Sequence, residues 1–430
     1  MKRAVVVGSG AGGSTVAREL QGDFQVTVLE AGGSFHPFPR SLSMIEKLKK
    51  PAGPFLNESQ IQWIFPAMKV SKTRDGMVLV KGIGEGGTTT LSTGSAIRQD
   101  QDLRAIGIDL DVEFEELARE LPISADHQAL WHVPTREAFT VCADMGLRPQ
   151  PTPKMIRRER CAGCGRCVLG CPRGAKWDSR DYLEQAIAEG AALVSGQKVR
   201  QVVIEDGRAT GVVATNGRRT QLYPAELVVL AAGGFGTPVI LQQSGIACQS
   251  SLFVDPVLCV ATRWEEAAQN REMPMPFTVQ RERFMISPYF DFVSFFFNSR
   301  WKYPAGDIFS LMIKLADTNA GTVSPRGVRK PLLETDRVRL EEAVNCCKEI
   351  LHKLGKADAD IFLGTLNAGH PGGMLPLTQR ESRTLHHGCL PPNLYVADAT
   401  LFPNSLGNPP ILTILALAKR IAMTCREHAG

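Results

Sequence analysis

The chain has 430 residues, of which 43% are apolar and 22% charged, and its formal net charge is +5. This length and composition fit a soluble globular protein with one large domain or two, and the weak charge argues against nucleic acid as a partner. No stretch approaches the roughly 18 uncharged apolar residues of a membrane span, and a predicted strand starts too near residue 1 for a signal peptide. We therefore expect a cytoplasmic protein without a membrane span.

The first predicted unit is a strand, a glycine-rich turn and a helix in RAVVVGSGAGGSTVAREL. Gly8, Gly10 and Gly13 have the G-x-G-x-x-G spacing, which allows a tight turn, close approach of the backbone to a pyrophosphate and close helix packing. A second predicted strand, QVTVLEAGG, ends at Glu30, about 20 residues downstream, where an acidic side chain binds a ribose hydroxyl. Together the two strands predict a dinucleotide-binding unit.

A second glycine-rich stretch, KGIGEGGTTTLSTGSAIR, covers residues 81–98. It contains Gly86, Gly87 and Thr88, whose backbone amides and hydroxyl can hydrogen-bond a cofactor around which the chain wraps. On composition alone, the stretch fits a flexible loop equally well.

Residues 101–149 are predicted to form a helical connection. VEFEELAREL has the amphipathic pattern of a surface helix, and we assign its acidic side chains to a solvated face without function. His127 and His132 have no partners at metal-ligand spacing and are interpreted as structural.

The densest cysteine run is CAGCGRCVLGCP, with Cys161, Cys164, Cys167 and Cys171 followed by a proline. Bacterial ferredoxins hold an iron–sulfur cluster with this C-x2-C-x2-C-x3-C-P spacing, whereas a structural zinc site or a redox C-x-x-C pair would not use all four thiols. A four-iron cluster is the first choice. Because the fourth cysteine of such a run can serve another cluster, a different fourth ligand or a three-iron cluster stays open. The other seven of the eleven cysteines are scattered, which suits a reducing compartment.

Regular elements are predicted again after the cysteines. SRDYLEQAIAEGA reads as a helix, and the alternation around Asp206-Gly207 and Asn216-Gly217 predicts a three-stranded meander with two type I′ turns. ELVVLAAGGFGTPVILQQSGI then predicts a strand that returns to the dinucleotide-binding sheet, a glycine turn and a helix. The aromatic stretch from Tyr289 to Tyr303 is interpreted as a strand lining the core or an apolar substrate pocket.

Near the C-terminus, His370 lies in AGHPGGM, a glycine and proline turn in which a histidine has no packing role. NLYVADATLFPNSLGNPPILTILALAKRIA follows and predicts a strand ending at Asp398, a loop, and a helix beginning at Asn408 with Pro409 at its first position. Such a helix directs the positive end of its dipole at whatever lies beyond Asn408.

Taken jointly and in order, these segments resemble the glucose/methanol/choline (GMC) oxidoreductase family of FAD-dependent flavoproteins. The segments are VVVGSGAGGSTVAREL with VTVLEAGG, GEGGTTTLSTGSAIR, AAGGFGTPVILQQSGI, HPGGM and the C-terminal NLYVADATLFPNSLGNPPILTILALAKRIA. The resemblance implies an α/β fold in which a Rossmann-like FAD-binding domain carries a substrate domain built on a mainly antiparallel sheet. We assign residues 1–100, 150–246 and 385–430 to the FAD-binding domain, with an iron–sulfur segment at 160–175, and residues 247–384 to the substrate domain.

The resemblance also implies roles for individual residues. His370 matches the family's active-site histidine, and Asn408 the position that carries His or Asn in members. Asp398 and Ala399 match the segment at the ribityl chain, and Val199 the position whose backbone contacts adenine. The glycines of both glycine-rich stretches, Glu30 with Ala31, and Thr88 are expected to contact FAD, and the helix after Pro409 to place its dipole near the flavin ring.

The combined prediction is an FAD- and iron–sulfur-dependent dehydrogenase that oxidises a small-molecule alcohol and delivers electrons to a protein partner or quinone. Two alternatives stay open. One is a flavin-dependent reductase of a carbonyl or alkene that is fed through the cluster, and the other is an electron-transfer subunit of a larger complex.

Overall fold

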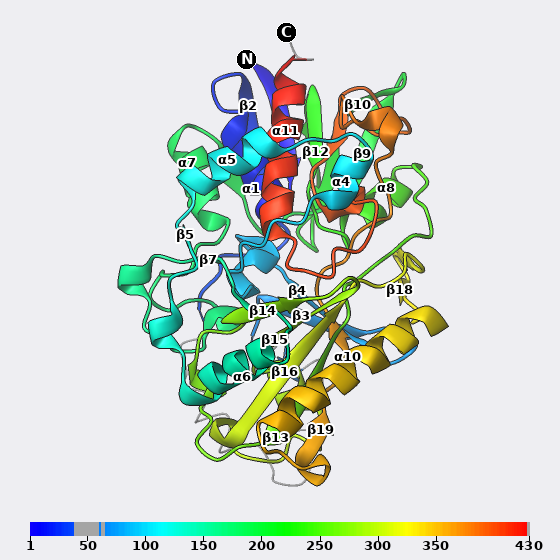
Figure 1. Cartoon of the computed structure of the whole chain (residues 1–430). Coiled ribbons are helices and arrows are strands. Elements are labelled where there is room, and N and C mark those ends of the chain that lie inside the picture. Colours follow the sequence, from blue (N-terminus) through cyan, green and yellow to red (C-terminus); the bar gives the residue numbers. More distant parts are fainter. Residues whose placement is uncertain (38–59, 62–64, 428–430) are drawn as a thin grey trace.

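The computed structural model describes residues 1–37, 60–61 and 65–427 (Figure 1). A parallel sheet with helices around it lies at the end of the molecule that carries both termini, and a large antiparallel sheet lies at the other end (Figure 1). The predicted fold class is therefore confirmed. Within the described residues, no helix is long and apolar enough to cross a membrane.

The parallel sheet combines strands from both ends and the middle of the chain. Its order is β21-β12-β1-β2-β8, and every neighbouring pair is parallel. The strands are β1 (Lys2–Val7), β2 (Phe24–Leu29), β8 (Ala192–Val194), β12 (Leu227–Leu230) and β21 (Leu394–Val396). All of β12 is buried, as a central parallel strand requires, and the predicted return of ELVVLAAGG to the first sheet is confirmed.

Six helices accompany this sheet in the described part of the chain. They are α1 (Ala11–Glu19), α4 (Gln101–Ala105), α5 (Asp111–Glu120), α7 (Arg180–Ala188), α8 (Thr237–Gln243) and α11 (Ile411–Glu427). α1 packs against both α7 and α11, and α5 lies against α11 (Figure 1). The C-terminal helix α11 therefore packs against two helices from the N-terminal part of the chain.

The acidic face of α5 does not point entirely to solvent as predicted. Glu113 is buried and pairs with Arg420 of α11, with Nη2 and Oε2 2.8 Å apart. Lys419 of α11 lies 2.9 Å from Glu116 and 2.8 Å from Glu120. The solvated-face prediction was wrong for Glu113, because α11, far away in the sequence, covers it, whereas Glu115 and Glu120 are exposed as predicted.

The predicted three-stranded meander is present as β9 (Lys198–Glu205), β10 (Arg208–Thr215) and β11 (Thr220–Pro224). Asp206 and Gly207 both have positive φ, at 48° and 75°, as a type I′ turn requires. The second turn is longer than predicted, because the Asn216 side-chain oxygen accepts hydrogen bonds from the amides of Arg218 and Arg219 and organises a four-residue loop.

The second sheet has nine strands in the order β3-β4-β20-β13-β16-β15-β14-β6, with β19 also paired to β13. All pairs are antiparallel except β4 with β20. The strands are β3 (Met68–Lys72), β4 (Val78–Gly82), β6 (Gln150–Pro151), β13 (Val257–Arg263), β14 (Phe277–Gln280), β15 (Phe284–Pro288), β16 (Ile308–Leu315), β19 (Ile361–Leu363) and β20 (Asn367–Ala368). The predicted domain division stays a prediction, and β3 and β4 join this sheet although they come from the range assigned to FAD binding.

Two helices, α6 (Val133–Asp144) and α10 (Glu334–Lys353), lie along one face of this sheet and share an apolar core with it (Figure 1). Cys142 of α6 and Cys347 of α10 are both buried in that core, so they pack as apolar residues. Two small ribbons complete the strands, β5 (Ile123–Ser124) with β7 (Lys154–Met155) and β17 (Thr322–Ser324) with β18 (Gly327–Arg329).

The aromatic stretch forms a short helix, α9 (Phe292–Phe297), and not the predicted strand. Asp291 caps it, because its carboxylate accepts the amide N–H of Val293 at 2.9 Å. Phe292, Phe295 and Phe296 are buried at helical spacing. The strand interpretation followed the aromatic content and overlooked both the cap and the spacing.

Gly12, which the sequence pattern did not single out, sets how closely α1 approaches β21. A Cβ at this position would lie 1.6 Å from the carbonyl oxygen of Ala397. We therefore expect Gly12→Ala to lower the free energy of unfolding by about 3 kcal/mol, the upper part of the range for overpacked cores. Urea denaturation followed by circular dichroism measures it.

The matched control is Gly306→Ala, where an added Cβ meets no atom within 4 Å and φ is not positive. We expect that change to stay within about 0.5 kcal/mol of wild type. Equal stability of the two variants would contradict the close helix–strand contact.

Candidate active site

The first glycine turn lies between β1 and α1. Gly8 has φ of +98°, and a Cβ on Gly13 would lie 1.9 Å from the Gly8 carbonyl oxygen, so both positions exclude side chains. At Gly10 the nearest atom to an added Cβ is 4.0 Å away. Gly10 therefore has room for an added methyl group only, and its contact with the pyrophosphate of FAD at the N–H groups of the first helical turn stays a prediction.

Glu30 joins the first glycine turn to the second glycine-rich loop. Its Oε2 accepts hydrogen bonds from the Ser9 amide at 3.0 Å and the Ser9 hydroxyl at 2.7 Å. Its Oε1 accepts from the amides of Gly32 at 2.9 Å and Gly84 at 3.2 Å. The buried carboxylate thus holds three segments together, and its contact with a ribose stays a prediction. Ala31, the next residue, is exposed.

The second glycine-rich loop touches the first. Gly86 and Gly87 have φ of +88° and +53°, and a Cβ on Gly87 would lie 3.0 Å from Cα of Gly10. Thr88 is exposed beside this contact, and its hydroxyl accepts the amide N–H of Gly82 at 3.1 Å. The predicted cofactor-binding glycines are therefore brought together, as a cofactor site shared by both loops requires.

Asp398 connects the end of β21 to the glycine turn before α8. Its Oδ2 accepts hydrogen bonds from the Gly233 amide at 2.8 Å and the Thr237 hydroxyl at 2.5 Å, and Oδ1 accepts from the Thr400 amide at 2.9 Å. Burial raises the pKa of this carboxyl, and the hydrogen bonds oppose the rise. Val199 is buried in β9, and its contact with adenine stays a prediction.

The turn that carries His370 packs between the segment of Ala399, which is predicted to contact FAD, and the glycine turn before α8. The Gly373 amide donates to the Ala399 carbonyl at 3.0 Å. On the other side, a Cβ on Gly234 would lie 2.1 Å from the Pro371 carbonyl oxygen. The candidate catalytic histidine is thus held where the strand ends of the parallel sheet meet the antiparallel sheet.

His370 contacts a buried lysine that the sequence did not point to. Lys314 Nζ is within hydrogen-bonding distance of His370 Nδ1 and lies 3.2 Å from Asp255 Oδ2. Burial, and then the Lys314 charge, lower the pKa of His370 well below its usual range, so the imidazole is neutral. The His370 side chain is still 29% exposed, so a substrate can reach it.

A second ion pair lies directly behind the first. Lys330 Nζ and Asp317 Oδ2 are 2.7 Å apart and both side chains are 0% exposed. Asp317 also accepts the amide N–H of Asp255 at 2.9 Å, and its Oδ1 lies 3.0 Å from the Ser405 hydroxyl oxygen. Ser405 bridges the pairs, because its hydroxyl oxygen is within hydrogen-bonding distance of both carboxylates and its single proton can go to either Asp255 or Asp317.

Sequence reasoning missed this network, although one signal was available. Lys314 stands in FSLMIKLAD, where the strand β16 is buried at every position. A lysine in such a strand requires a buried partner, because an unpaired buried ammonium is strongly disfavoured. The partner itself, from a loop 59 residues away in sequence, could not be chosen from spacing alone.

Asn408 lies beside this network but its amide is paired elsewhere. Gln280 Nε2 donates to its Oδ1 at 2.9 Å, and its Nδ2 donates back to Gln280 Oε1 at 3.3 Å. The preceding Gly407 amide donates to Asp255 at 3.3 Å, so Asp255 contacts both the Asn408 segment and the Lys314–His370 pair. Asp255 thus lies 3.8 Å from His370 Nδ1 and contacts the residue before Asn408, while Asn408 itself is paired with Gln280.

The helix after Asn408 begins later than predicted. α11 starts at Ile411, and the first helical hydrogen bond runs from the Ile414 amide to the Pro410 carbonyl at 2.9 Å. Pro410 disfavours the helical conformation for Pro409, so the predicted start at Asn408 was wrong by three residues. Contacts of Asn408 and Pro409 with FAD stay predictions.

The cysteine run forms a loop closed by a short pair of antiparallel segments. Ile156 bridges Lys176, and the Arg157 amide donates to the Ala175 carbonyl at 2.7 Å. Within the loop, Gly165 and Gly170 have φ of +71° and +83°. Added Cβ atoms there would lie 2.2 Å from Asn270 and 2.6 Å from Phe35. The loop is therefore seated closely on the protein at both glycines.

The four predicted cluster ligands line one cavity. Cys161, Cys164, Cys167 and Cys171 surround a space of about 20 Å³, close to the size of one water. Within the described residues, no three or more His, Cys, Asp or Glu side chains converge closely enough to hold a metal ion. Four thiols are the donor set that an iron–sulfur cluster takes, but in this structure they do not form a metal-binding group, and the cluster stays a prediction.

Two buried lysines form part of the surroundings of these thiols. Lys154 Nζ donates to the Pro274 carbonyl at 2.7 Å and the Ser95 hydroxyl at 3.0 Å, and it contacts no carboxylate among the described residues. Burial lowers the pKa of Lys154 to about 7, and Cys167 and Cys161 oppose this fall. Lys176, which lines the cavity, donates to the carbonyls of Thr89 and Thr90 at 2.8 Å.

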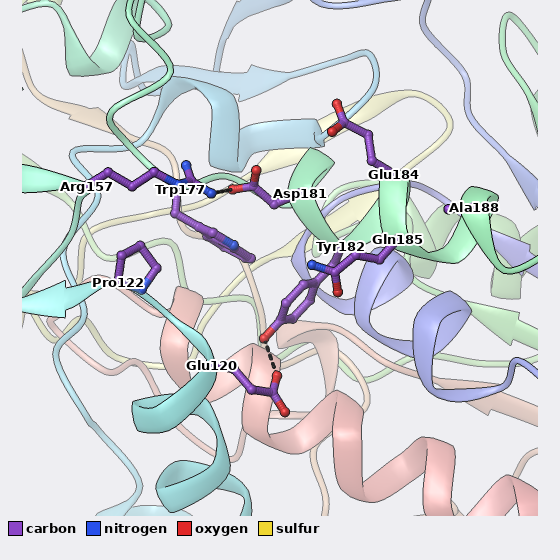
Figure 2. Close-up of a pocket in the computed structure, with 9 residues that line it drawn as sticks. All are labelled: Glu120, Pro122, Arg157, Trp177, Asp181, Tyr182, Glu184, Gln185 and Ala188. Atoms are coloured by element: carbon purple, nitrogen blue, oxygen red, sulfur yellow. Dashed lines mark hydrogen bonds and ion pairs between the residues drawn. The ribbon is translucent and has the colours of Figure 1, made fainter. Parts of the chain in front are cut away.

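A larger cavity, of about 380 Å³, lies away from the residues predicted to act (Figure 2). Trp177, Pro122 and Tyr182 give it apolar walls, and the Tyr182 hydroxyl donates to Glu120 at 2.7 Å. None of the predicted catalytic, cofactor-binding or metal-binding residues lines it. It is therefore not the site of the predicted chemistry.

Comparisons with known proteins agree with the geometry. The sequence profile of the family described as GMC oxidoreductase matches residues 3–258. An uncharacterized protein of Methanocaldococcus jannaschii is 26% identical over 96% of this chain and 97% of its own length. A long-chain-alcohol oxidase of Arabidopsis thaliana is 24% identical over 99% of this chain and 66% of its own.

Among solved structures, formate oxidase of Aspergillus oryzae, studied for FAD modification, superposes with a TM-score of 0.73 at 14% identity, covering 99% of this chain and 98% of that one. At that identity the match supports the fold alone. The profile match over more than half of the chain, with the parallel sheet and its glycine turns, identifies the family: this chain belongs to the GMC oxidoreductases, and FAD is the cofactor that this membership supports.

Proposed function

We propose that this oxidoreductase is an FAD- and iron–sulfur-dependent dehydrogenase that oxidises an alcohol and delivers the electrons to a protein partner. The observation that carries the iron–sulfur part is the pair of buried lysines beside four thiols. Among the described residues, Lys154 donates only to neutral oxygens, so thiolates or an anionic cluster in the neighbouring loop would be the negative charges that stabilise its ammonium form.

His370 and Asn408 would act on the substrate oxygen. When bound, FAD supplies the acceptor for a hydride from the substrate carbon. His370, neutral and reachable, would hydrogen-bond the hydroxyl and take its proton, and the amide of Asn408 would orient the oxygen. In the reverse direction the same groups would serve reduction of a carbonyl.

Lys176 links the two predicted cofactor sites. It lines the cysteine cavity, and its ammonium donates to the carbonyl oxygens of Thr89, Thr90 and Ser92, which follow the glycines predicted to contact FAD. This placement supports a short route between flavin and cluster. A cluster supplies one-electron transfer, which a simple oxidase would not need.

The partner would be acidic. Arg158, Arg160 and Arg173 of the cysteine loop are exposed, with Glu159 as the acidic residue among them. Arg271 is also exposed, and it follows Asn270, against which Gly165 of the cysteine loop packs. A basic surface around the predicted cluster favours a negatively charged electron carrier over a neutral quinone.

Protein purified without oxygen should contain one FAD and about four irons per chain. Cys161→Ser should lose the iron and keep the flavin, because the glycine loops do not depend on the thiols. Cys389→Ser, at an exposed cysteine outside the run, should lose neither. Iron analysis and flavin absorbance measure both, and EPR of the oxidised Cys171→Ser protein distinguishes three-iron from four-iron binding. Flavin without iron in the wild type would refute the iron–sulfur proposal.

His370→Ala should slow reduction of the bound flavin by alcohols by about 10²–10⁴-fold, the usual contribution of a general acid or base. Anaerobic stopped-flow spectroscopy with primary and secondary alcohols of increasing length measures the rate, and flavin content should not change. His352→Ala on α10, exposed and paired with Asp358, is the control. Wild-type rates in His370→Ala would instead favour the electron-transfer subunit.

Charge reversal at Arg158 and Arg160 should slow electron transfer to an acidic ferredoxin by at least about 10-fold at low salt, and the difference should shrink as salt is added. Reversal of Arg218 and Arg219, exposed in the meander loop, is the matched control and should change little. If both double variants slow electron transfer by the same factor, the net charge of the protein governs docking, and this surface does not.

A further inference from the structure

Two lysines, Lys314 and Lys330, lie in the buried network beside the candidate catalytic histidine, and they differ in the number of hydrogen-bond acceptors around the ammonium group. Lys330 donates to the carbonyls of Thr318 at 2.6 Å and Ala320 at 3.0 Å, and pairs with Asp317 at 2.7 Å. An ammonium has three protons, so Lys330 is fully satisfied. Such a lysine is a fixed positive charge.

Lys314 is held less completely. It contacts His370 Nδ1, lies 3.2 Å from Asp255 Oδ2 and is 3.5 Å from the Asp255 carbonyl. Both ion-pairing side chains are 2% exposed or less. With only one carboxylate and one long carbonyl contact, Lys314 can lose a proton without leaving three broken hydrogen bonds.

We propose that Lys314 is a positioning residue that stores the substrate proton behind His370. The proposal rests on the proposed alcohol oxidation at His370. In the state ready for oxidation, Lys314 is a neutral amine that accepts a hydrogen bond from Nδ1–H, and Nε2 of His370 is free for the substrate.

The proton balance follows from this arrangement. As the hydroxyl O–H bond breaks, its proton goes to Nε2 of His370, and the Nδ1 proton passes to Nζ of Lys314. The C–H bond would break with its electron pair, and FAD, when bound, would be the acceptor of that hydride. The products are a carbonyl compound and reduced flavin, with Lys314 as an ammonium ion and His370 neutral as the Nε2–H tautomer.

The charges around the pair favour this proton position. Burial lowers the pKa of Lys314, and Asp255 and Asp317 oppose that fall. Once protonated, Lys314 is neutralised by Asp255, while Lys330 neutralises Asp317. The proton therefore rests on Lys314 and not on the imidazole, whose own pKa is held low by burial and by Lys314.

The test is the tautomer of His370 in the flavin-loaded protein without substrate, measured from ring ¹⁵N chemical shifts after histidine labelling. His370→Gln assigns its signals. Between about pH 6 and pH 10, the range in which a buried lysine can titrate, the wild type should change from the Nε2–H to the Nδ1–H tautomer. Lys314→Arg should stay Nε2–H throughout, because a guanidinium keeps its proton.

Lys314→Met should carry Nδ1–H at all these pH values, because Asp255 Oδ2, 3.8 Å from Nδ1, is then the remaining partner. If Lys314→Met does not fold, the double variant Lys314→Met with Asp255→Asn removes both charges and should show no pH-linked change. The control, Arg263→Met with Glu265→Gln, removes an exposed ion pair outside this network and should keep the wild-type change.

Flavin reduction gives a second readout. Lys314→Arg should slow it by about 10²-fold or more while flavin content stays constant, because the final proton acceptor is lost. A wild-type tautomer that does not change with pH, or the same change in Lys314→Arg, would overturn the proposal. If the tautomer behaves as expected but no alcohol reduces the flavin, the proton store stands and the proposed substrate class fails.

Discussion

Two buried ion pairs, Asp255 with Lys314 and Asp317 with Lys330, form the floor under the candidate catalytic histidine. They join a loop before β13, the end of β16 and the segment that contains Ser405 and Asn408. Removing one member of such a pair leaves an unpaired buried charge, which typically costs about 3–5 kcal/mol. The position of His370 therefore depends on buried charged residues behind it, which come from segments far apart in the sequence.

The cofactor-facing part of the molecule is built mainly from backbone. The two glycine-rich loops are so close that a Cβ added to Gly87 would lie 3.0 Å from Cα of Gly10. The Glu30 carboxylate accepts hydrogen bonds from amides of both loops. Side chains are excluded where the loops meet, and N–H groups are left for an anionic ligand. Precision at this site comes from close packing of main chain, whereas precision at His370 comes from charge.

Local patterns predicted the elements that repeat a known spacing. Glycine spacing and apolar runs placed β1, α1, β2, β12 and β21 correctly, because these residues determine their own conformation. The solvated position of Glu113 in α5 and the strand at Phe292–Phe297 were wrong, since a distant helix covers the first and a local cap changes the second. Lys314 and Asp255 were missed for a similar reason. These two residues pair with each other across segments that are adjacent only in the folded chain.

The loop that contains the four thiols begins and ends at one pair of bridged residues, Ile156 and Lys176. Both ends are anchored by backbone hydrogen bonds, and Lys176 is fixed to carbonyl groups outside the loop. The thiols are therefore not needed to bring the ends together. The loop can therefore reach its folded conformation while its four thiols are still free, so any group that they bind can be added after the chain has folded.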